Sequence, residues 1–363
     1  MKKLLPLYLL LLAIPMGCID SFSDPSLLTL KEGKLIVEGF ITTNSEKFRV
    51  TLTKSRAALD RENPSVVINA KVKIIDNLKN EYELPHTRQG IYLTTENQQV
   101  IVGRSYKVVI EFSDGKKYES TPELVRSAPP IDSVKYQFVE ATDFQGYKKP
   151  YFEVTGEMQD DAKSKDYYRW DWTHYQYLSY CENNYNGISK ILFRVPCCDD
   201  CWGPKKIYGD INFSDDYLFN GKKISQPLLS LPYNSKRPYY MDVRLYSVSK
   251  EYSQFWKLVK AQINNVGGVF DNPPATIQGN IKNVNDPDEQ VLGFFGAAAS
   301  SEKQIYVLRS KAPYPPVIQQ LSGRVILVKD CTPCKEGDFR TNFKPKNWND
   351  DYNTLFYDPM VEF

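Results

Sequence analysis

Apolar and polar positions alternate along much of residues 31–126, and this period of two predicts a small all-β unit. The clearest of the predicted strands are residues 35–41, 48–53, 70–74, 106–112 and 117–120. The last two flank Asp114-Gly115, a pair that favours a type I′ hairpin turn. About seven short strands in roughly 95 residues are typical of an immunoglobulin-like β-sandwich, which is the fold we expect here.

Residues 127–130 contain Pro129-Pro130, which neither a strand nor a helix can continue through, so they mark a predicted domain boundary. Residues 131–363 are then expected to form a larger β-rich domain. Its predicted strands are residues 151–158, 167–180, 239–247, 291–299, 304–309 and 324–329, with 304–309 pairing beside 291–299. The overall prediction is a mainly β protein of two domains.

The strand at residues 167–180 is unusually aromatic, and its alternation places Tyr168, Trp170 and Trp172 on one face. An exposed face of this kind would form a stacking platform for sugars or for a partner. A buried face would be ordinary sheet packing, because aromatic side chains are favoured in strands. The second interpretation is favoured, and the first is kept as an alternative.

Residues 249–266 carry the one convincing helical pattern in the chain. Its apolar positions follow the spacing of a single helix face and are Tyr252, Phe255, Trp256, Val259 and Ile263. Ser249 is suited to cap the N-terminus and Gly267 to end the helix. We expect this face to pack on the sheet of the second domain, with a partner-binding face as the alternative.

The start of the chain resembles a bacterial lipoprotein signal. Lys2 and Lys3 precede an apolar run that is shorter than the roughly 20 residues of a membrane-spanning helix. Gly17 then precedes Cys18, which predicts a signal peptide over residues 1–17 and lipidation of Cys18. Residues 18–30 are polar and predict a tether. An ordinary secretory signal is the alternative.

The charges balance closely, with 46 basic and 44 acidic residues. Removal of residues 1–17 takes away Lys2 and Lys3 and leaves 44 of each sign, a formal net charge of zero. A nucleic-acid partner would require a basic face, so we expect no nucleic acid among the partners.

The chain has seven cysteines, and six remain if Cys18 is lipidated. These six are Cys181, Cys197, Cys198, Cys201, Cys331 and Cys334. An even set in an exported protein predicts disulfides, although six cysteines allow 15 pairings that the sequence does not distinguish. The two C-x-x-C motifs leave a structural zinc site and a redox-active pair as alternatives.

No catalytic signature accompanies these features. His86, in a predicted loop, and His174, in the aromatic strand, are the only histidines, and neither lies in a metalloprotease or nucleophile-elbow motif. Residues 283–289 are rich in oxygen ligands but lack the spacing of an EF-hand, so calcium is a minor alternative. Paired carboxylates are frequent in the chain. A glycosidase needs two carboxylates at a defined distance, and the sequence does not determine the distances between these groups. We therefore expect no cofactor and no metal, and assign no catalytic residue.

Several motifs in a fixed order resemble one known family. These are the lipoprotein-like start, the late Asp-Gly hairpin, Pro-Pro at the boundary, Cys201-Trp202, Phe270-Asp271-Asn272-Pro273-Pro274, Gly279-Asn280-Ile281, Val291-Leu292-Gly293-Phe294-Phe295 and the paired cysteines near the end. Together they resemble the Bacteroidota lipoproteins catalogued as domain of unknown function 4249. The resemblance implies an outer-membrane lipoprotein, often encoded beside a TonB-dependent receptor, and supplies no catalytic residues.

The leading hypothesis is a non-enzymatic accessory or binding protein, held at the periplasmic or cell-surface face of the outer membrane by its lipid anchor and associated with a TonB-dependent receptor. A second hypothesis is a surface protein that binds glycans by stacking them on Tyr168, Trp170 and Trp172, or cleaves them with nearby Asp residues as acid and base. A third is a structural or adhesive lipoprotein.

Overall fold

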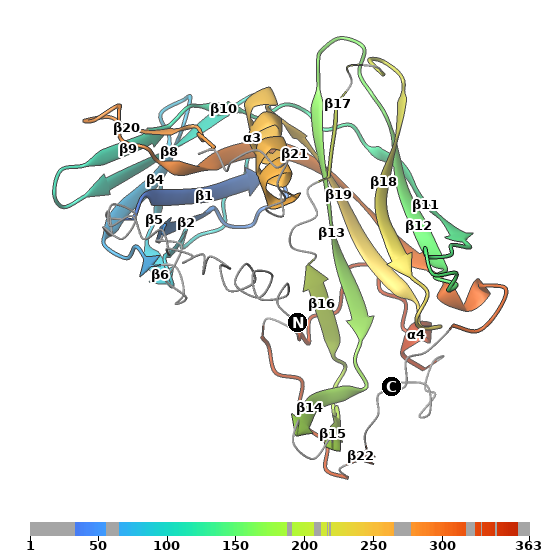
Figure 1. Ribbon diagram of the computed structural model, residues 1–363. Coiled ribbons are helices and arrows are strands. Elements are labelled where there is room, and N and C mark those ends of the chain that lie inside the picture. Colours follow the sequence, from blue (N-terminus) through green and yellow to red (C-terminus); the bar gives the residue numbers. More distant parts are fainter. Residues whose placement is uncertain are drawn as a thin grey trace, which may run out of the picture.

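The computed structural model describes residues 33–55, 65–186, 191–206, 212–215, 217, 219–264, 277–316, 324–327, 329–337 and 340–354. The predicted signal peptide, Cys18 and the tether lie outside these residues, as does Gly267. The protein is mainly β, as the sequence predicts, and its strands form two units side by side (Figure 1).

The first unit is built from two sheets that share one hydrophobic core. One sheet contains β1 (Leu35–Thr42), β2 (Arg49–Lys54), β3 (Ser65–Val66), β6 (His86–Arg88) and β7 (Ile91–Leu93). The other contains β4 (Ala70–Asp76), β5 (Glu81–Leu84), β8 (Ser105–Phe112), β9 (Lys117–Ser120), β10 (Glu123–Leu124) and β20 (Ile281–Asn283). Alternate residues such as Val37, Leu52 and Ile74 are fully buried between them, which accounts for the period of two. The immunoglobulin-like topology stays a prediction.

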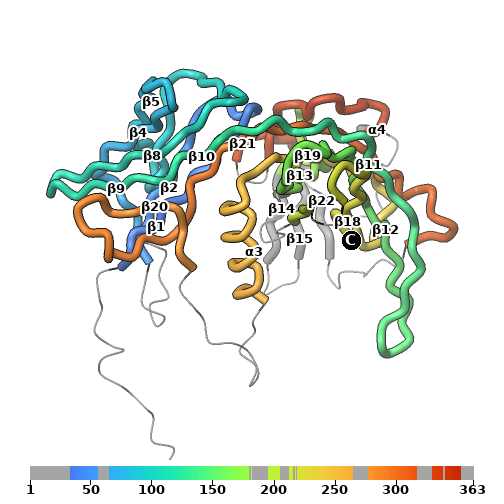
Figure 2. Tube along the Cα trace, turned by 90° about the horizontal axis from the view of Figure 1, so that it is seen from above, coloured from blue at the N-terminus to red at the C-terminus, as the bar shows by residue number. Residues whose placement is uncertain are grey.

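A single long strand, β21 (Leu292–Val307), joins the two units. Its first half pairs in parallel with β1, from Leu292 opposite Ile36 to Ala298 opposite Thr42. Its second half pairs antiparallel with a strand of the second unit (Figure 2). Residues 281–299, which the sequence places in the second domain, therefore complete the first unit. The two strands predicted at 291–299 and 304–309 are one strand.

The parallel pairing depends on Gly293, which has a φ of +89°. A Cβ atom at this position would lie 2.0 Å from the carbonyl oxygen of Val37. Only glycine can adopt this backbone conformation so close to the carbonyl of Val37. This explains the glycine in the Val-Leu-Gly-Phe-Phe sequence.

Two local predictions in the first unit are wrong. The β8–β9 hairpin has a positive φ at Gly115 but not at Asp114, and Phe112 N–H donates to Lys116 O at 3.0 Å. This is a three-residue loop, a turn followed by one left-handed glycine, and not a type I′ turn. His86 lies in the short edge strand β6 and not in a loop, because it pairs with Tyr92.

The second unit also has two sheets around a core. β13 (Tyr167–Tyr177), β16 (Trp202–Lys206), β17 (Asn212–Asp215) and β19 (Tyr239–Val248) continue the sheet of β21. β11 (Ile131–Val139), β12 (Tyr151–Gln159) and β18 (Lys223–Pro232) form the facing sheet. A third sheet contains β14 (Tyr180–Asn186), β15 (Ile191–Pro196) and β22 (Arg324–Leu327). A short 3-10 helix, Arg309–Lys311, follows β21.

The predicted helix is α3 (Lys250–Asn264), and Tyr252 N–H donates to Ser249 Oγ at 3.1 Å, so Ser249 caps the helix as expected. Tyr252 and Phe255 are buried against β21. Ile263, predicted to lie on the packed face, is 60 % exposed because the helix extends beyond the sheet at this end. A four-residue helix, α4 (Asp351–Thr354), lies at the end of the described residues.

Candidate functional site

The aromatic strand β13 turns its large side chains into the protein. Tyr168, Trp170 and Trp172 are 1 %, 0 % and 4 % exposed and belong to the core of the second unit. Tyr168 Oη donates to Asp160 Oδ1 at 2.6 Å, and Trp170 Nε1 donates to Ser214 Oγ at 3.2 Å. The stacking platform for sugars is therefore wrong, because none of these rings can reach a ligand.

The opposite face of β13 carries Arg169 toward a groove beside α3. One wall of the groove is the flank of α3 with Tyr252, Phe255 and Trp256, and the floor is the outer face of β1, β2 and β21. The groove has a volume of about 500 Å³, within the range of small-molecule sites. It exists because α3 covers the sheet over β21 and leaves the neighbouring part of β1 and β2 open.

The Arg169 guanidinium lies among aromatic rings at the seam between the two units. Its central carbon is 5.2 Å from the ring centre of Phe40, 5.9 Å from those of Tyr252 and Trp256, and 6.0 Å from that of Tyr246. These are favourable cation–π distances. The guanidinium also donates to Tyr252 Oη and lies 3.8 Å from Asp171 Oδ2. The rings and Tyr252 thereby hold its plane in place.

Arg169 keeps its positive charge in the folded protein. Burial disfavours the charged form, but Tyr252, Asp171 and Tyr246 outweigh that effect and raise the pKa of Arg169 above its ordinary value. Two further charged residues line the groove, the exposed side chains of Arg49 and Glu38. The charged residues that line the groove are thus two arginines and one glutamate, and Asp171 beside Arg169 offsets part of the positive charge.

Glu123 is a buried carboxyl group beneath the N-terminus of α3. It is 4 % exposed, and Asn280 Nδ2 donates to its Oε1 at 3.4 Å. Burial raises the pKa of Glu123 to about 7, and Glu251 adds to the increase, against hydrogen bonds from Ser249 and Asn280. Folding therefore favours the protonated form of this side chain.

We expect the free energy of unfolding to fall by about 3 kcal/mol between pH 4.5 and 7 through Glu123 alone, because the unfolded carboxyl ionises near 4.5 and the folded one near 7. Glu123→Gln keeps the acceptor for Asn280 and lacks this decline, so at pH 8 it should be the more stable protein. Urea unfolding at pH 5 and pH 8 measures the difference. Glu83→Gln, at an exposed position, serves as the control. Parallel pH profiles for wild type and Glu123→Gln would contradict the prediction.

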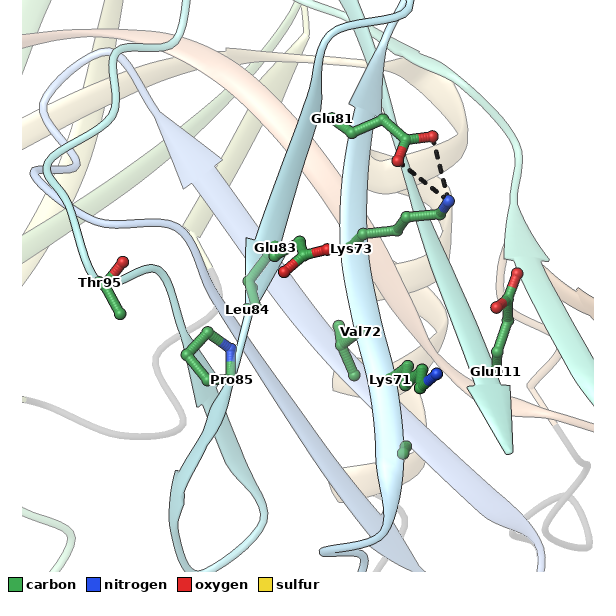
Figure 3. A pocket seen from close by; sticks show the side chains of 10 residues that line it. Lys71, Val72, Lys73, Glu81, Glu83, Leu84, Pro85, Thr95 and Glu111 are labelled. Atoms are coloured by element: carbon green, nitrogen blue, oxygen red, sulfur yellow. Dashed lines mark hydrogen bonds and ion pairs between the residues drawn. The ribbon is translucent and has the colours of Figure 1, made fainter. Parts of the chain in front are cut away.

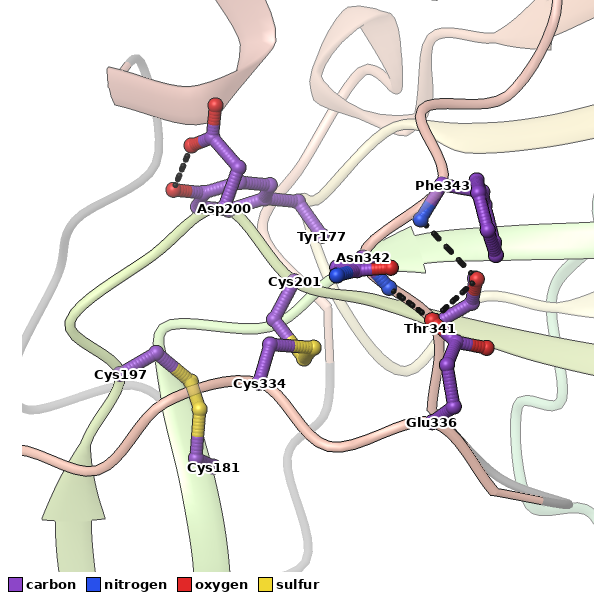
Figure 4. The surroundings of a disulfide bond; sticks show 10 residues. All are labelled: Tyr177, Cys181, Cys197, Asp200, Cys201, Cys334, Glu336, Thr341, Asn342 and Phe343. Carbon is purple, nitrogen blue, oxygen red and sulfur yellow. Dashed lines mark hydrogen bonds between the residues drawn. A yellow bond between two sulfur atoms is a disulfide. The ribbon is translucent and has the colours of Figure 1, made fainter.

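All six predicted disulfide cysteines are paired, as Cys181–Cys197, Cys198–Cys331 and Cys201–Cys334. The two C-x-x-C motifs bond to each other, first to first and second to second, so neither forms a redox-active pair within itself. The sulfur atoms of Cys181, Cys197 and Cys201 lie within 4.8 Å of one another (Figure 4). This cluster fixes the segment around Cys334 to the strands that lead into β16. The predicted disulfides are confirmed, and they use the sulfurs that a zinc site would need.

A second hollow of about 500 Å³ lies on the outer face of β4 and β5 (Figure 3). Its charged side chains are Lys71, Lys73, Glu81, Glu83 and Glu111. Lys73 Nζ lies 3.0 Å from Glu81 Oε1, so part of this charge is neutralised within the hollow itself. It lacks the aromatic walls of the groove beside α3.

The remaining candidates from the sequence have structural explanations. His174 is 7 % exposed and stacks on Tyr239 with ring centres 3.6 Å apart. His86 packs edge-on against Tyr92. In the oxygen-rich segment 283–289, Asn283 Nδ2 donates to Glu289 and Asn283 Oδ1 accepts from the backbone of Asn285, so these groups bond to each other.

Sequence reasoning missed Arg169, Arg49 and Glu38, the charged residues of the groove. One signal was present, because Arg169 occupies a position between Tyr168 and Trp170 and must face away from them in a strand. Nothing in the sequence indicated that β1, β2 and α3 meet at that face.

These features define the class of the protein: a two-unit β protein with one continuous sheet, a helix beside a charged aromatic groove, and a disulfide cluster. Residues 22–304 match the family model "Domain of unknown function (DUF4249)". The match covers most of the chain, so the protein belongs to this family, as the resemblance in its sequence predicts.

Other comparisons add little. A search of curated proteins gives no match. A Corynebacterium diphtheriae protein described as membrane anchored aligns at 10% identity and a TM-score of 0.18, over 59% of this chain and 54% of that one. The BSP domain of a biofilm associated protein aligns at 7% identity and a TM-score of 0.14, over 75% of this chain and 59% of that one. The chain thus spans little more than half of each structure, and scores this low define no common fold. Within the described residues, none of the helices has the length and apolar character needed to span a bilayer.

Proposed function

We propose that this protein is an outer-membrane lipoprotein, anchored through Cys18, that acts as a non-enzymatic binding or accessory component of a TonB-dependent receptor. The groove beside α3 carries the binding part of this proposal, because it is a formed hollow with aromatic walls and a fixed cation. The lipoprotein-like start of the chain supports the anchor. Association with the receptor rests on analogy with other members of the family. A shared fold does not by itself establish a shared function.

A binding role agrees with the way the groove is built. It lies where β1, β13 and α3 meet, and all three are held by the continuous sheet or by packing on it. Sites on such rigid elements keep their geometry without a ligand, which lowers the entropic cost of binding. The glycan hypothesis is not retained, because its aromatic residues are buried. A structural or adhesive role is the alternative that the experiment must separate.

The test is purification of the full-length protein from its native outer membrane in mild detergent, followed by mass spectrometry of co-eluting proteins. We expect a TonB-dependent barrel in stoichiometric amount, and a lipid-modified N-terminal cysteine. Replacement of residues 1–18 by an ordinary secretory signal followed by serine is the matched control, and the protein should leave the membrane fraction because the anchor is lost. Elution of the lipidated protein alone, under several detergents, would contradict receptor association and favour a structural or adhesive role.

A further inference from the structure

We propose that the groove beside α3 binds a small planar aromatic carboxylate, with its carboxylate at Arg169 and its ring against the aromatic flank of α3. This inference names a ligand class for the binding role proposed above and rests on that role. It does not depend on the identity of the receptor.

The anionic end of the ligand is assigned by Arg169. A guanidinium has five N–H donors in a planar fork that matches a carboxylate. Among the described residues, Arg169 donates one hydrogen bond, to Tyr252 Oη, and its approach to Asp171 at 3.8 Å is too long for a hydrogen bond. Its side chain is 28 % exposed and lines the groove, so its remaining donors can reach a ligand there.

The aromatic rings around Arg169 favour a carboxylate over water as the partner of its guanidinium. The rings of Phe40, Tyr252 and Trp256 hold the guanidinium in one orientation before any ligand arrives. Little side-chain entropy is then lost when two parallel hydrogen bonds form to a carboxylate. A bidentate contact of this kind is stronger than a contact with a mobile surface arginine.

The apolar residues that line the groove indicate the shape of the rest of the ligand. Trp256 and Val259 of α3 are only partly buried, and they face the groove together with Ile36 on β1. These positions offer apolar surface on both sides of a hollow of about 500 Å³. A planar ring fits between an aromatic flank and a flat sheet face, where offset or edge-on packing adds to burial of apolar area.

Arg49 at the rim adds a second guanidinium to the groove. Arg49 and Glu38 are exposed at the open side of the groove, on β2 and β1. Asp171 beside Arg169 offsets part of this positive charge, so the preference for an anion over a neutral or cationic ligand of the same shape comes mainly from the free N–H donors of Arg169. Glu38 repels the anion weakly, because it is solvated, and its replacement by glutamine should tighten binding slightly.

The test is calorimetric titration of residues 18–363 carrying Cys18→Ser, which lack both the lipid and the apolar signal and so require no detergent, with 2-naphthoate and its neutral isostere 2-naphthamide. We expect one 2-naphthoate site per chain and binding of 2-naphthamide that is at least tenfold weaker, the range of a lost charge-assisted hydrogen bond. Arg169→Met should weaken 2-naphthoate at least tenfold and leave 2-naphthamide nearly unchanged. Leu258→Ala, an exposed position on the same helix, is the matched control and should change neither affinity.

Arg169 also packs between the two units, so Arg169→Met could lower stability. Arg49→Gln, at an exposed position, should weaken 2-naphthoate two- to threefold without affecting the fold, and Trp256→Ala should weaken both probes. Equal affinity of wild type for the two probes, or the absence of saturable binding at millimolar 2-naphthoate, would overturn the inference. Failure to recover a receptor with the lipidated protein, while 2-naphthoate binds as expected, would count against receptor association alone.

Discussion

Loss of either bridge between the C-x-x-C motifs should lower the free energy of unfolding by about 2 kcal/mol, and loss of the second bridge by about 5 kcal/mol more. Cys198–Cys331 and Cys201–Cys334 each close a loop with a sequence separation of 133. While one bridge remains, the long loop stays closed in the unfolded chain, and the other bridge restrains only a few residues. Removal of the last bridge releases the whole loop.

The measurement is a double-mutant cycle with paired Cys→Ala variants, followed by urea unfolding under non-reducing conditions. The two removals should be coupled by about 3 kcal/mol. The Cys181–Cys197 bridge, with a separation of 16, is the comparison, and its removal should cost about 3 kcal/mol. Additive costs for removal of Cys198–Cys331 and of Cys201–Cys334 would show that these two bridges do not close the same loop.

Trp170→Ala should lower the free energy of unfolding by about 4 kcal/mol, because the indole is fully buried between the two sheets of the second unit. Gly156 on β12 makes room for the ring, since a Cβ atom there would lie 2.7 Å from Trp170 Cζ3. The substitution therefore leaves a cavity in a site shaped for the indole, and also leaves Ser214 without its hydrogen-bond donor.

Circular dichroism during urea unfolding measures this loss independently of tryptophan fluorescence. Phe144→Ala is the matched control, because Phe144 is 94 % exposed on the β11–β12 loop, and its replacement should change stability by less than about 0.5 kcal/mol. A Trp170→Ala protein as stable as the wild type would contradict the packing role of this indole.

Local sequence patterns determined much of this protein. Alternation located β2 and β4 to within a few residues, because one buried face imposes a period of two whatever the partner strands are. Runs of apolar and aromatic residues located β1 and β13, because such side chains are favoured in strands. The apolar spacing after Ser249 located α3 and its cap, because helix ends are satisfied by neighbours in sequence. The even set of cysteines predicted disulfides, and the order of motifs predicted the family.

Only the tertiary structure decided how these elements combine. A strand carries no sequence signal for its distant partner, so the parallel pairing of β21 with β1 and the return of residues 281–299 to the first unit were not predicted. The same holds for the disulfide pairing, which depends on which segments become neighbours. Alternation placed Tyr168, Trp170 and Trp172 on one face, but the facing sheet of β11, β12 and β18 decided that this face is buried. The other face, with Arg169, then became the functional candidate because α3 covers only part of the joined sheet beside it.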